Sequence, residues 1–148
     1  LATTTVQVNV EPRTATPIAL PDAVSHPQDR TIEIVVVRIE GVTRVHTFVE
    51  DIELALEADP LDVLVEPTHD GYAVTVTASS FARDVTLLAD RAASDATVDD
   101  ALVTVTAGQS ATFRVRTKAS ELQETLGRPP VLRTANDLQH IKTDVRRS

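Results

Sequence analysis

Residues 61–78, LDVLVEPTHDGYAVTVTA, decide the fold class that we expect for this chain. Apolar and polar residues alternate on both sides of Asp70-Gly71, a dipeptide that is typical of tight turns between strands. The alternation predicts two antiparallel strands, Leu61–Glu66 and Tyr72–Ala78, each with one buried face. The second strand has valine on one face and threonine on the other, at Val74, Val76, Thr75 and Thr77.

A second hairpin is expected upstream of this stretch. The strand Thr31–Ile39 contains four consecutive apolar residues, Ile34–Val37, which fill both of its faces and predict a central position in a sheet. Glu40-Gly41 predicts a two-residue turn, in which glycine supplies a positive φ. Val42–Val49 is therefore expected to return as the partner strand.

Short strands separated by polar turns are expected through most of the chain. Val6–Val10 and Thr14–Leu20 precede the hairpin, and Pro17 restricts the latter to a sheet edge or an irregular segment. Asp84–Ala89 follows the hairpin of residues 61–78, and residues 90–100 have a loop composition. A final hairpin is expected from Ala101–Thr106 and Ala111–Thr117, with an apolar face made by Val103, Val105, Phe113 and Val115. This spacing predicts an all-β, antiparallel β-sandwich architecture.

The chain is expected to hold two modules and a tail. We place the first module at residues 1–58 and the second at residues 59–118, with 50–60 as a connector. Residues 119–148 are interpreted as an irregular C-terminal tail, because Gly127-Arg128-Pro129-Pro130 breaks any regular element. The charge changes at the same point: residues 1–117 hold 8 basic and 18 acidic residues, whereas residues 118–148 hold 6 and 4.

Composition excludes several classes of chemistry. The 148 residues include no cysteine, so the chain can form no disulfide, zinc–thiolate site or thiol nucleophile. The net charge of -8 argues against a nucleic-acid partner, which requires a basic surface. No run reaches 18 apolar residues, so we expect no membrane-spanning segment. The 21 valines and 20 threonines favour strands, since β-branched side chains suit a pleated surface.

The ionisable residues show no spacing typical of a metal or acid/base site. The four histidines, which lie too far apart for a local metal motif, are His26, His46, His69 and His140. Asp95, Asp99 and Asp100 could surround a calcium ion, but they lack the spacing of a calcium loop and are more simply a solvated loop. Glu50, Asp51 and Glu53 could supply paired carboxylates, although a solvated edge explains them more simply.

Nucleophilic, phosphate-binding and sugar-stacking motifs are also missing from the sequence. Ser79-Ser80 has no Gly-x-Ser-x-Gly surroundings, and the chain has only 4 glycines with which to build a phosphate loop. Tyr72 follows a turn, while core packing is the expected use of Phe48, Phe81 and Phe113. We therefore assign no catalytic, metal-binding or cofactor-binding residue and no cofactor.

Several segments nevertheless resemble a known family. Residues 71–90, GYAVTVTASSFARDVTLLAD, and 95–117, DATVDDALVTVTAGQSATFRVRT, resemble the last immunoglobulin-like domain of actinobacterial-type β-mannosidases of glycoside hydrolase family two. Residues 130–138, PVLRTANDL, are similar to the C-terminal end of those enzymes, and residues 45–51, VHTFVED, resemble the end of their preceding β-sandwich domain. The resemblance is spread along the chain rather than concentrated in one motif.

The resemblance implies a non-catalytic part of a larger enzyme. Such enzymes remove terminal β-linked mannose by a retaining mechanism, with a nucleophilic and an acid/base glutamate on a (β/α)₈ barrel. Neither glutamate's motif matches a position here, so we expect this chain alone to be inactive and to support a catalytic barrel that precedes it. The sequence begins at Leu1 rather than methionine, which fits this interpretation. A bacterial cytoplasmic location is expected, with secretion left open.

Two further expectations concern the partners of the chain. The resemblance begins partway into the first module, so an incomplete sandwich would leave unpaired strand edges near Thr3–Val10 or Ile32–Val37. Such edges invite self-association. The Arg83-Asp84 pair could orient its loop, with a contribution of about 0–1 kcal/mol. The competing hypothesis is a free-standing carbohydrate-binding or protein-interaction module, because a β-sandwich supports many functions.

Overall fold

A computed structural model describes residues 2–138 of the chain and divides it into two compact units. Unit 1 comprises Leu1–Ala55, and unit 2 begins at Leu56. The division falls three residues before the boundary predicted at residue 58. The two units are described separately below.

Unit 1 is built around a single hairpin. Strand β1 (Ile34–Ile39) pairs with β2 (Val42–Thr47) in antiparallel register, from Ile34 opposite Thr47 to Ile39 opposite Val42. Glu40 and Gly41 have φ values of 45° and 82°, the two positive values that a type I′ turn requires. The predicted hairpin is therefore confirmed. The helix α1 (Asp22–Ser25) precedes it.

Two sequence expectations for unit 1 are wrong. Residues 6–10 form no strand, and β1 lies in a two-stranded sheet rather than at the centre of a larger one. Residues 14–20 form an irregular segment, the second of the two alternatives that Pro17 left open. Val6, Val8 and Val10 are 43–49% exposed, so their alternation faces no buried layer. A period-two pattern creates a suitable face, but a strand also needs a neighbouring backbone to satisfy its hydrogen bonds.

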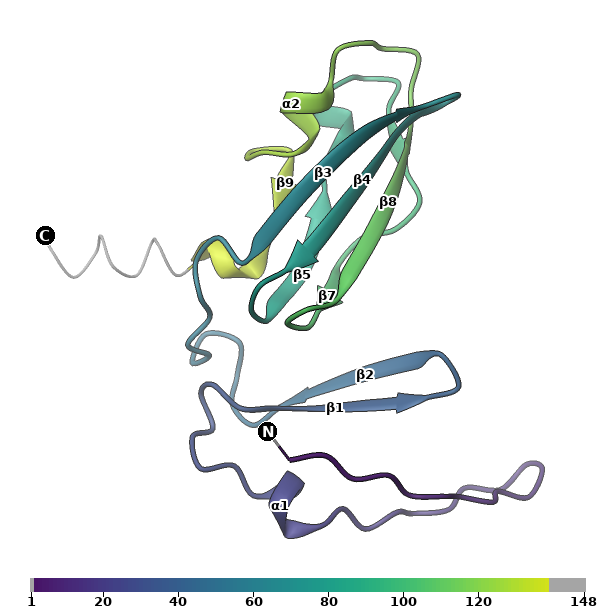
Figure 1. Ribbon diagram of the computed structural model, residues 1–148, viewed down its shortest axis with the longest axis vertical. Coiled ribbons are helices and arrows are strands. Elements are labelled where there is room, and N and C mark those ends of the chain that lie inside the picture. The colour runs from purple at the N-terminus through teal and green to yellow at the C-terminus, as the bar shows by residue number, and fades with distance from the viewer. Residues whose placement is uncertain (1, 139–148) are drawn as a thin grey trace, which may run out of the picture. The chain divides into compact units, whose positions relative to one another are not determined.

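Unit 2 is an antiparallel β-sandwich of two sheets, which confirms the predicted fold class. The four-stranded sheet has the order β3-β4-β8-β6, and β3, β4 and β8 run side by side in Figure 1. The three-stranded sheet has the order β7-β5-β9. The strands are β3 (Leu61–Thr68), β4 (Gly71–Ala78), β5 (Ala82–Leu87), β6 (Thr97–Val98), β7 (Val103–Val105), β8 (Ser110–Arg116) and β9 (Leu132–Arg133).

The sandwich core follows the period-two pattern of the central strands. In β4 every second residue is buried, from Tyr72 to Ala78, and Phe113 on β8 is only 1% exposed. The predicted hairpin of β3 and β4 is confirmed, with Leu61 opposite Ala78. The largest completely buried side chains of unit 2 include Phe113, Leu87, Leu126, Val74, Val76, Val85, Val115 and Val131.

The predicted final hairpin, however, is wrong. β7 pairs with β5 in one sheet, whereas β8 pairs with β4 and β6 in the other, so the connection between them crosses from sheet to sheet. The connecting loop bonds to the end of β4: the amide of Gly108 donates to the carbonyl of Ala78 at 2.7 Å, and Ala78 donates to Gln109 at 3.0 Å. The four predicted apolar residues still share one core.

The segment after residue 118, which we expected to be an irregular tail, contributes to unit 2 as far as residue 138. It contains α2 (Gln123–Leu126), β9 and the 3-10 helix η2 (Ala135–Asp137). The predicted loop 90–100 is also partly ordered, because the 3-10 helix η1 (Ala89–Arg91) overlaps its start and β6 lies within it. β9 pairs with β5, and Leu126, Val131 and Leu132 are at most 6% exposed. These contacts place residues 119–138 within the sandwich. The two α-helices of residues 2–138 have four residues each, and neither meets the length and apolarity needed to cross a bilayer.

Candidate functional site

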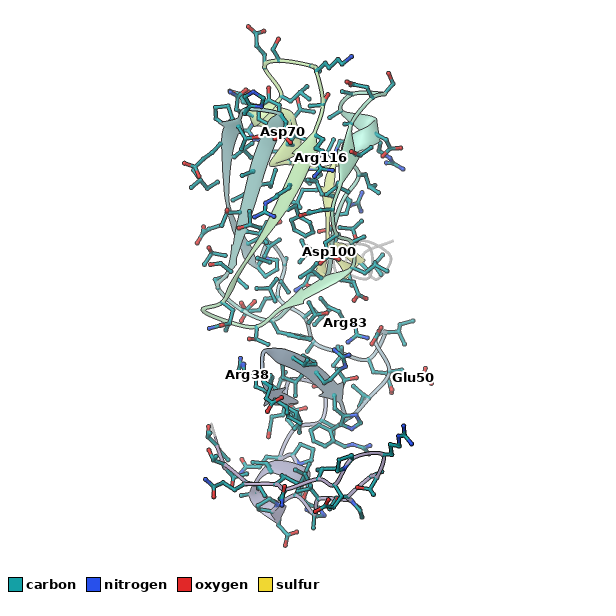
Figure 2. The ribbon with its side chains drawn as sticks, turned by 90° about the vertical axis from the view of Figure 1, so that its right-hand side faces the viewer. Arg38, Glu50, Asp70, Arg83, Asp100 and Arg116 are labelled. Carbon is teal, nitrogen blue, oxygen red and sulfur yellow. The ribbon has the colours of Figure 1, made fainter. Side chains whose placement is uncertain are left out.

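A groove lies at the end of the sandwich where the β3–β4 turn meets the segments after β8 and before β6. It has a volume of about 660 Å³, and we call it the end groove. Asp70 and Arg116 lie close together at this end of unit 2 in Figure 2. The end groove is lined by residues 67–72, by Asp95 and Thr97, and by residues 116–120.

Tyr72 lines the end groove but is itself buried. Tyr72 is 5% exposed, and its hydroxyl group donates to the carbonyl of Ala119 at 3.4 Å and accepts from the amide of Leu122 at 3.3 Å. Buried tyrosines usually find such partners for the hydroxyl. The ring therefore packs in the core and does not present a stacking platform for a sugar.

Asp95 holds in place the segment that follows β8, which forms one side of the end groove. One carboxylate oxygen accepts from the Thr117 hydroxyl and the other from the Lys118 amide, both at 2.8 Å. The amide of Lys118 and then the hydroxyl of Thr117 lower the pKa of Asp95 below its usual value of 3.8, since both bonds favour the charged form. Asp95 thus holds two segments together as a carboxylate.

Replacing Asp95 with asparagine is expected to lower the melting temperature of the chain near neutral pH. A lowered pKa contributes stability above the ordinary carboxyl pKa, and that contribution is lost as the pH falls through the folded-state pKa. The difference in melting temperature between the parent and D95N should therefore narrow below pH 3.8, which is the ordinary pKa of an aspartate carboxyl group. Circular-dichroism melts across acid pH measure it, with D62N on the exposed β3 surface as control; a difference that grows on acidification would contradict the assignment.

The three aspartates considered for calcium do not converge. Asp99 accepts from the amide of Arg114 at 2.8 Å, and Asp100 accepts from the amide of Ala101 at 2.8 Å. Each carboxylate thus fixes a different stretch of backbone. Within residues 2–138, no group of three or more histidine, aspartate or glutamate side chains could hold a metal ion.

The histidines and the connector carboxylates make local contacts. In unit 1 the ring of His26 lies 3.5 Å from Asp22, and His46 packs edge-on against Phe48 with ring centroids 5.3 Å apart. In unit 2 His69 lines the end groove, whereas His140 lies outside the described residues. Glu53 accepts from the amide of Glu50 at 3.3 Å, and Glu50, Asp51 and Glu53 are all exposed.

Within residues 2–138, neither hydroxyl of the Ser79-Ser80 pair bonds to a histidine, so the pair forms no nucleophilic arrangement. The Ser79 hydroxyl donates to the carbonyl of Pro60 at 3.1 Å, which ties the end of β4 to the residue that precedes β3. The Ser80 hydroxyl is buried and has no hydrogen-bond partner within the described chain. Ser79 therefore has a connecting role between two strand ends.

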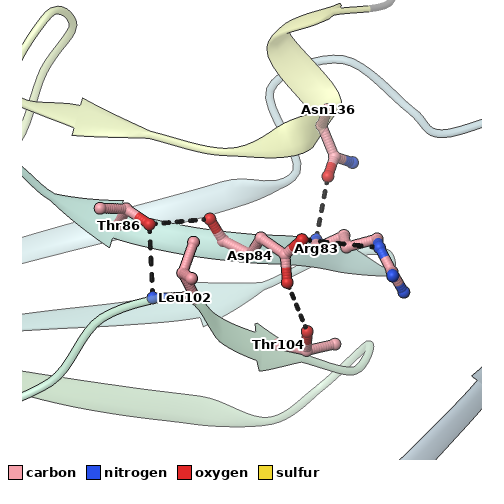
Figure 3. Close-up of polar contacts among 6 residues, drawn as sticks. All are labelled: Arg83, Asp84, Thr86, Leu102, Thr104 and Asn136. Atoms are coloured by element: carbon pink, nitrogen blue, oxygen red, sulfur yellow. Dashed lines mark hydrogen bonds and ion pairs between the residues drawn. The ribbon is translucent and has the colours of Figure 1, made fainter. Parts of the chain in front are cut away.

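The Arg83-Asp84 pair lies at a bulge in β5 (Figure 3). Asp84 has a φ of 51°, and its carboxylate lies 3.7 Å from Nε of Arg83. The carboxylate also accepts from the Thr104 hydroxyl at 3.5 Å, while the Asp84 carbonyl accepts from Thr86 at 3.1 Å. The pair therefore joins β5 to β7 beside the bulge.

Asn136 is the buried polar residue that sequence reasoning missed. Its side chain is 0% exposed and makes three hydrogen bonds to backbone: it accepts from the amide of Arg83 at 3.0 Å and donates to the carbonyls of Glu57 at 2.8 Å and Phe81 at 3.0 Å. Figure 3 shows it reaching towards the bulge. A local signal was available, because Thr134 and Asp137 cap the turn that presents it.

Comparison with known proteins identifies one family. The family model Ig_mannosidase, described as an Ig-fold domain, matches residues 56–138. No curated protein matches the chain.

Proposed function

The chain belongs to the family of mannosidase Ig-fold domains, and from this we propose that it is the non-catalytic, C-terminal part of a β-mannosidase of glycoside hydrolase family two. In the proposal it supports a catalytic (β/α)₈ barrel from the same polypeptide. The observation that carries the proposal is the match over residues 56–138. That range contains every strand of the sandwich and Asn136, which fastens its last segment.

The contacts in unit 2 are consistent with a supporting role. The side chains that draw separate segments together, Asn136, Asp95 and Tyr72, all bond to backbone groups. Networks of this kind fix the positions of loops. A sandwich whose end loops are held in place by such bonds suits a module that packs against another domain.

The proposal assigns hydrolysis to residues outside this chain. Retaining glycosidases need two carboxyl groups about 5 Å apart on either side of the scissile bond. We therefore expect the purified 148-residue chain to release no nitrophenol from 4-nitrophenyl β-mannoside. An authentic β-mannosidase under the same conditions is the positive control. Release that follows the chain through purification would contradict the proposal.

The gene supplies a direct test of the partner domain. We expect the reading frame upstream of the Leu1 codon to continue into alternating strands and helices of a barrel with two catalytic glutamates. A stop codon or an unrelated domain there would overturn the proposal and favour a free-standing module. Self-association through the edges of unit 1 and a bacterial cytoplasmic location stay predictions.

A further inference from the structure

The end groove is a wide, open depression with balanced charge. Its volume is about 660 Å³, and an open groove of this kind suits an extended ligand rather than an enclosed one. Its lining contains two acidic residues, Asp70 and Asp95, and two basic residues, Arg116 and Lys118. Because the two signs are equal in number, the site has no excess of either sign to favour a charged ligand. The balance favours a neutral, polar one.

One charged pair in the end groove is largely exposed to solvent. Oδ2 of Asp70 lies 3.5 Å from Nε of Arg116, and the two side chains are 62% and 78% exposed. The other carboxylate oxygen of Asp70 accepts from the Thr68 hydroxyl at 3.3 Å. Asp95 likewise uses both of its oxygens, on Thr117 and Lys118. A carboxylate oxygen can accept a second hydrogen bond, so the exposed Asp70 can still accept from a ligand. The Asp70–Arg116 pair is thus the exposed acceptor–donor combination of the site.

An adjacent carboxylate and guanidinium match a pair of neighbouring hydroxyl groups. A hydroxyl group both donates and accepts, a carboxylate only accepts, and a guanidinium only donates. One hydroxyl of a vicinal diol can therefore donate to Asp70 while its neighbour accepts from Arg116. Neutral sugars carry such diols along their length, so the chemistry of the pair suits a linear oligosaccharide.

The backbone around this pair is held in place before any ligand arrives. Gly71 packs so closely that an added Cβ would lie 2.1 Å from the carbonyl oxygen of Val115, and the amide of Thr117 donates to the carbonyl of Asp70 at 3.2 Å. Tyr72 and Asp95 fix the segment that follows β8. A preformed site loses little conformational freedom on binding.

We propose that the end groove binds a neutral, linear oligosaccharide through Asp70 and Arg116. The choice of β-mannan as the polysaccharide that supplies this oligosaccharide rests on the proposed function. Tyr72, the aromatic residue of the lining, is buried, so the site lacks the stacking that strengthens sugar binding. The expected dissociation constant is therefore about 1 mM. Such a site would hold a distal part of a long substrate without taking part in bond cleavage.

Titration of the isotope-labelled 148-residue chain with β-1,4-mannohexaose tests the proposal by nuclear magnetic resonance. Saturable shifts are expected in the amides of residues 67–72 and 116–120. The R116Q variant should bind about tenfold more weakly, because a hydrogen bond to a charged group is lost. The R114Q variant, altered on the same strand outside the end groove, should bind like the parent.

A second variant keeps the test decisive. D70N removes the negative charge and replaces one of the two acceptor oxygens with a donor, so it should weaken binding in the same direction, even if R116Q fails to fold. Absence of saturable shifts in the end groove, or parental affinity in a folded R116Q or D70N chain, would overturn the proposal. Either result leaves the supporting role intact, because that role is tested through the upstream reading frame.

Discussion

Replacing Asn136 with alanine should destabilise unit 2 by about 3 kcal/mol, since each buried polar group left unpaired costs about 1–3 kcal/mol. The substitution removes the partner of the Arg83 amide and of the Glu57 and Phe81 carbonyls at once. For a domain of this size the melting temperature should fall by about 15 °C.

The chain supplies its own reporter for this measurement. It contains 1 tyrosine and no tryptophan, and that tyrosine, Tyr72, is buried in the core of unit 2. Urea denaturation followed by tyrosine fluorescence therefore reports the unfolding of unit 2. The matched control is N9A, at the exposed Asn9 of unit 1. A loss below about 0.5 kcal/mol in N136A, the level of ordinary surface changes, would show that these bonds do not stabilise the sandwich.

The second large effect is expected for Gly71→Ala. The new Cβ would lie 2.1 Å from the carbonyl oxygen of Val115, and the backbone has a φ of 146°. The neighbouring atom belongs to the β8 backbone, so the ladder between β4 and β8 must shift. Steric overlap and backbone strain each cost about 1–3 kcal/mol, which gives an expected loss of about 4 kcal/mol.

Gly108→Ala separates the two causes of this loss. Gly108 also has a positive φ, 76°, but an added Cβ would meet nothing within 4 Å. Its expected cost is the backbone strain alone, about 1–2 kcal/mol. Urea denaturation followed by far-ultraviolet circular dichroism compares the two variants. Equal losses in G71A and G108A would contradict a steric role for the close approach of Gly71 to β8.

Local patterns predicted the hairpins because both of their determinants lie in neighbouring residues. Alternating valine and threonine define the faces of β4, and Asp70-Gly71 and Glu40-Gly41 supply the turns. The same patterns failed where a strand needs a distant partner. Residues 6–10 alternate as a strand does but pair with no strand in the described part of the chain. β7 and β8 were predicted to pair with each other, but they lie in different sheets.

The C-terminal segment and the end groove depend on contacts that no local pattern contains. β9 is a strand of two residues stabilised by β5, and Asn136 lies in a polar stretch that by composition resembles a surface loop. The end groove brings together residues 67–72, 95–97 and 116–120. The Asp70-Gly71 turn was predictable, but the convergence of the three segments required the whole sandwich.

The hydrogen bond between Asn136 and Glu57 has a consequence for synthesis in the cell. The two residues are 79 positions apart, so this hydrogen bond, which closes unit 2, cannot form until nearly all of the unit has left the ribosome. At about 5–20 residues per second, the interval between translation of the two residues is about 4–16 s. A nascent chain that stops before residue 136 lacks this closure, which would leave incomplete products more open to proteases than finished ones.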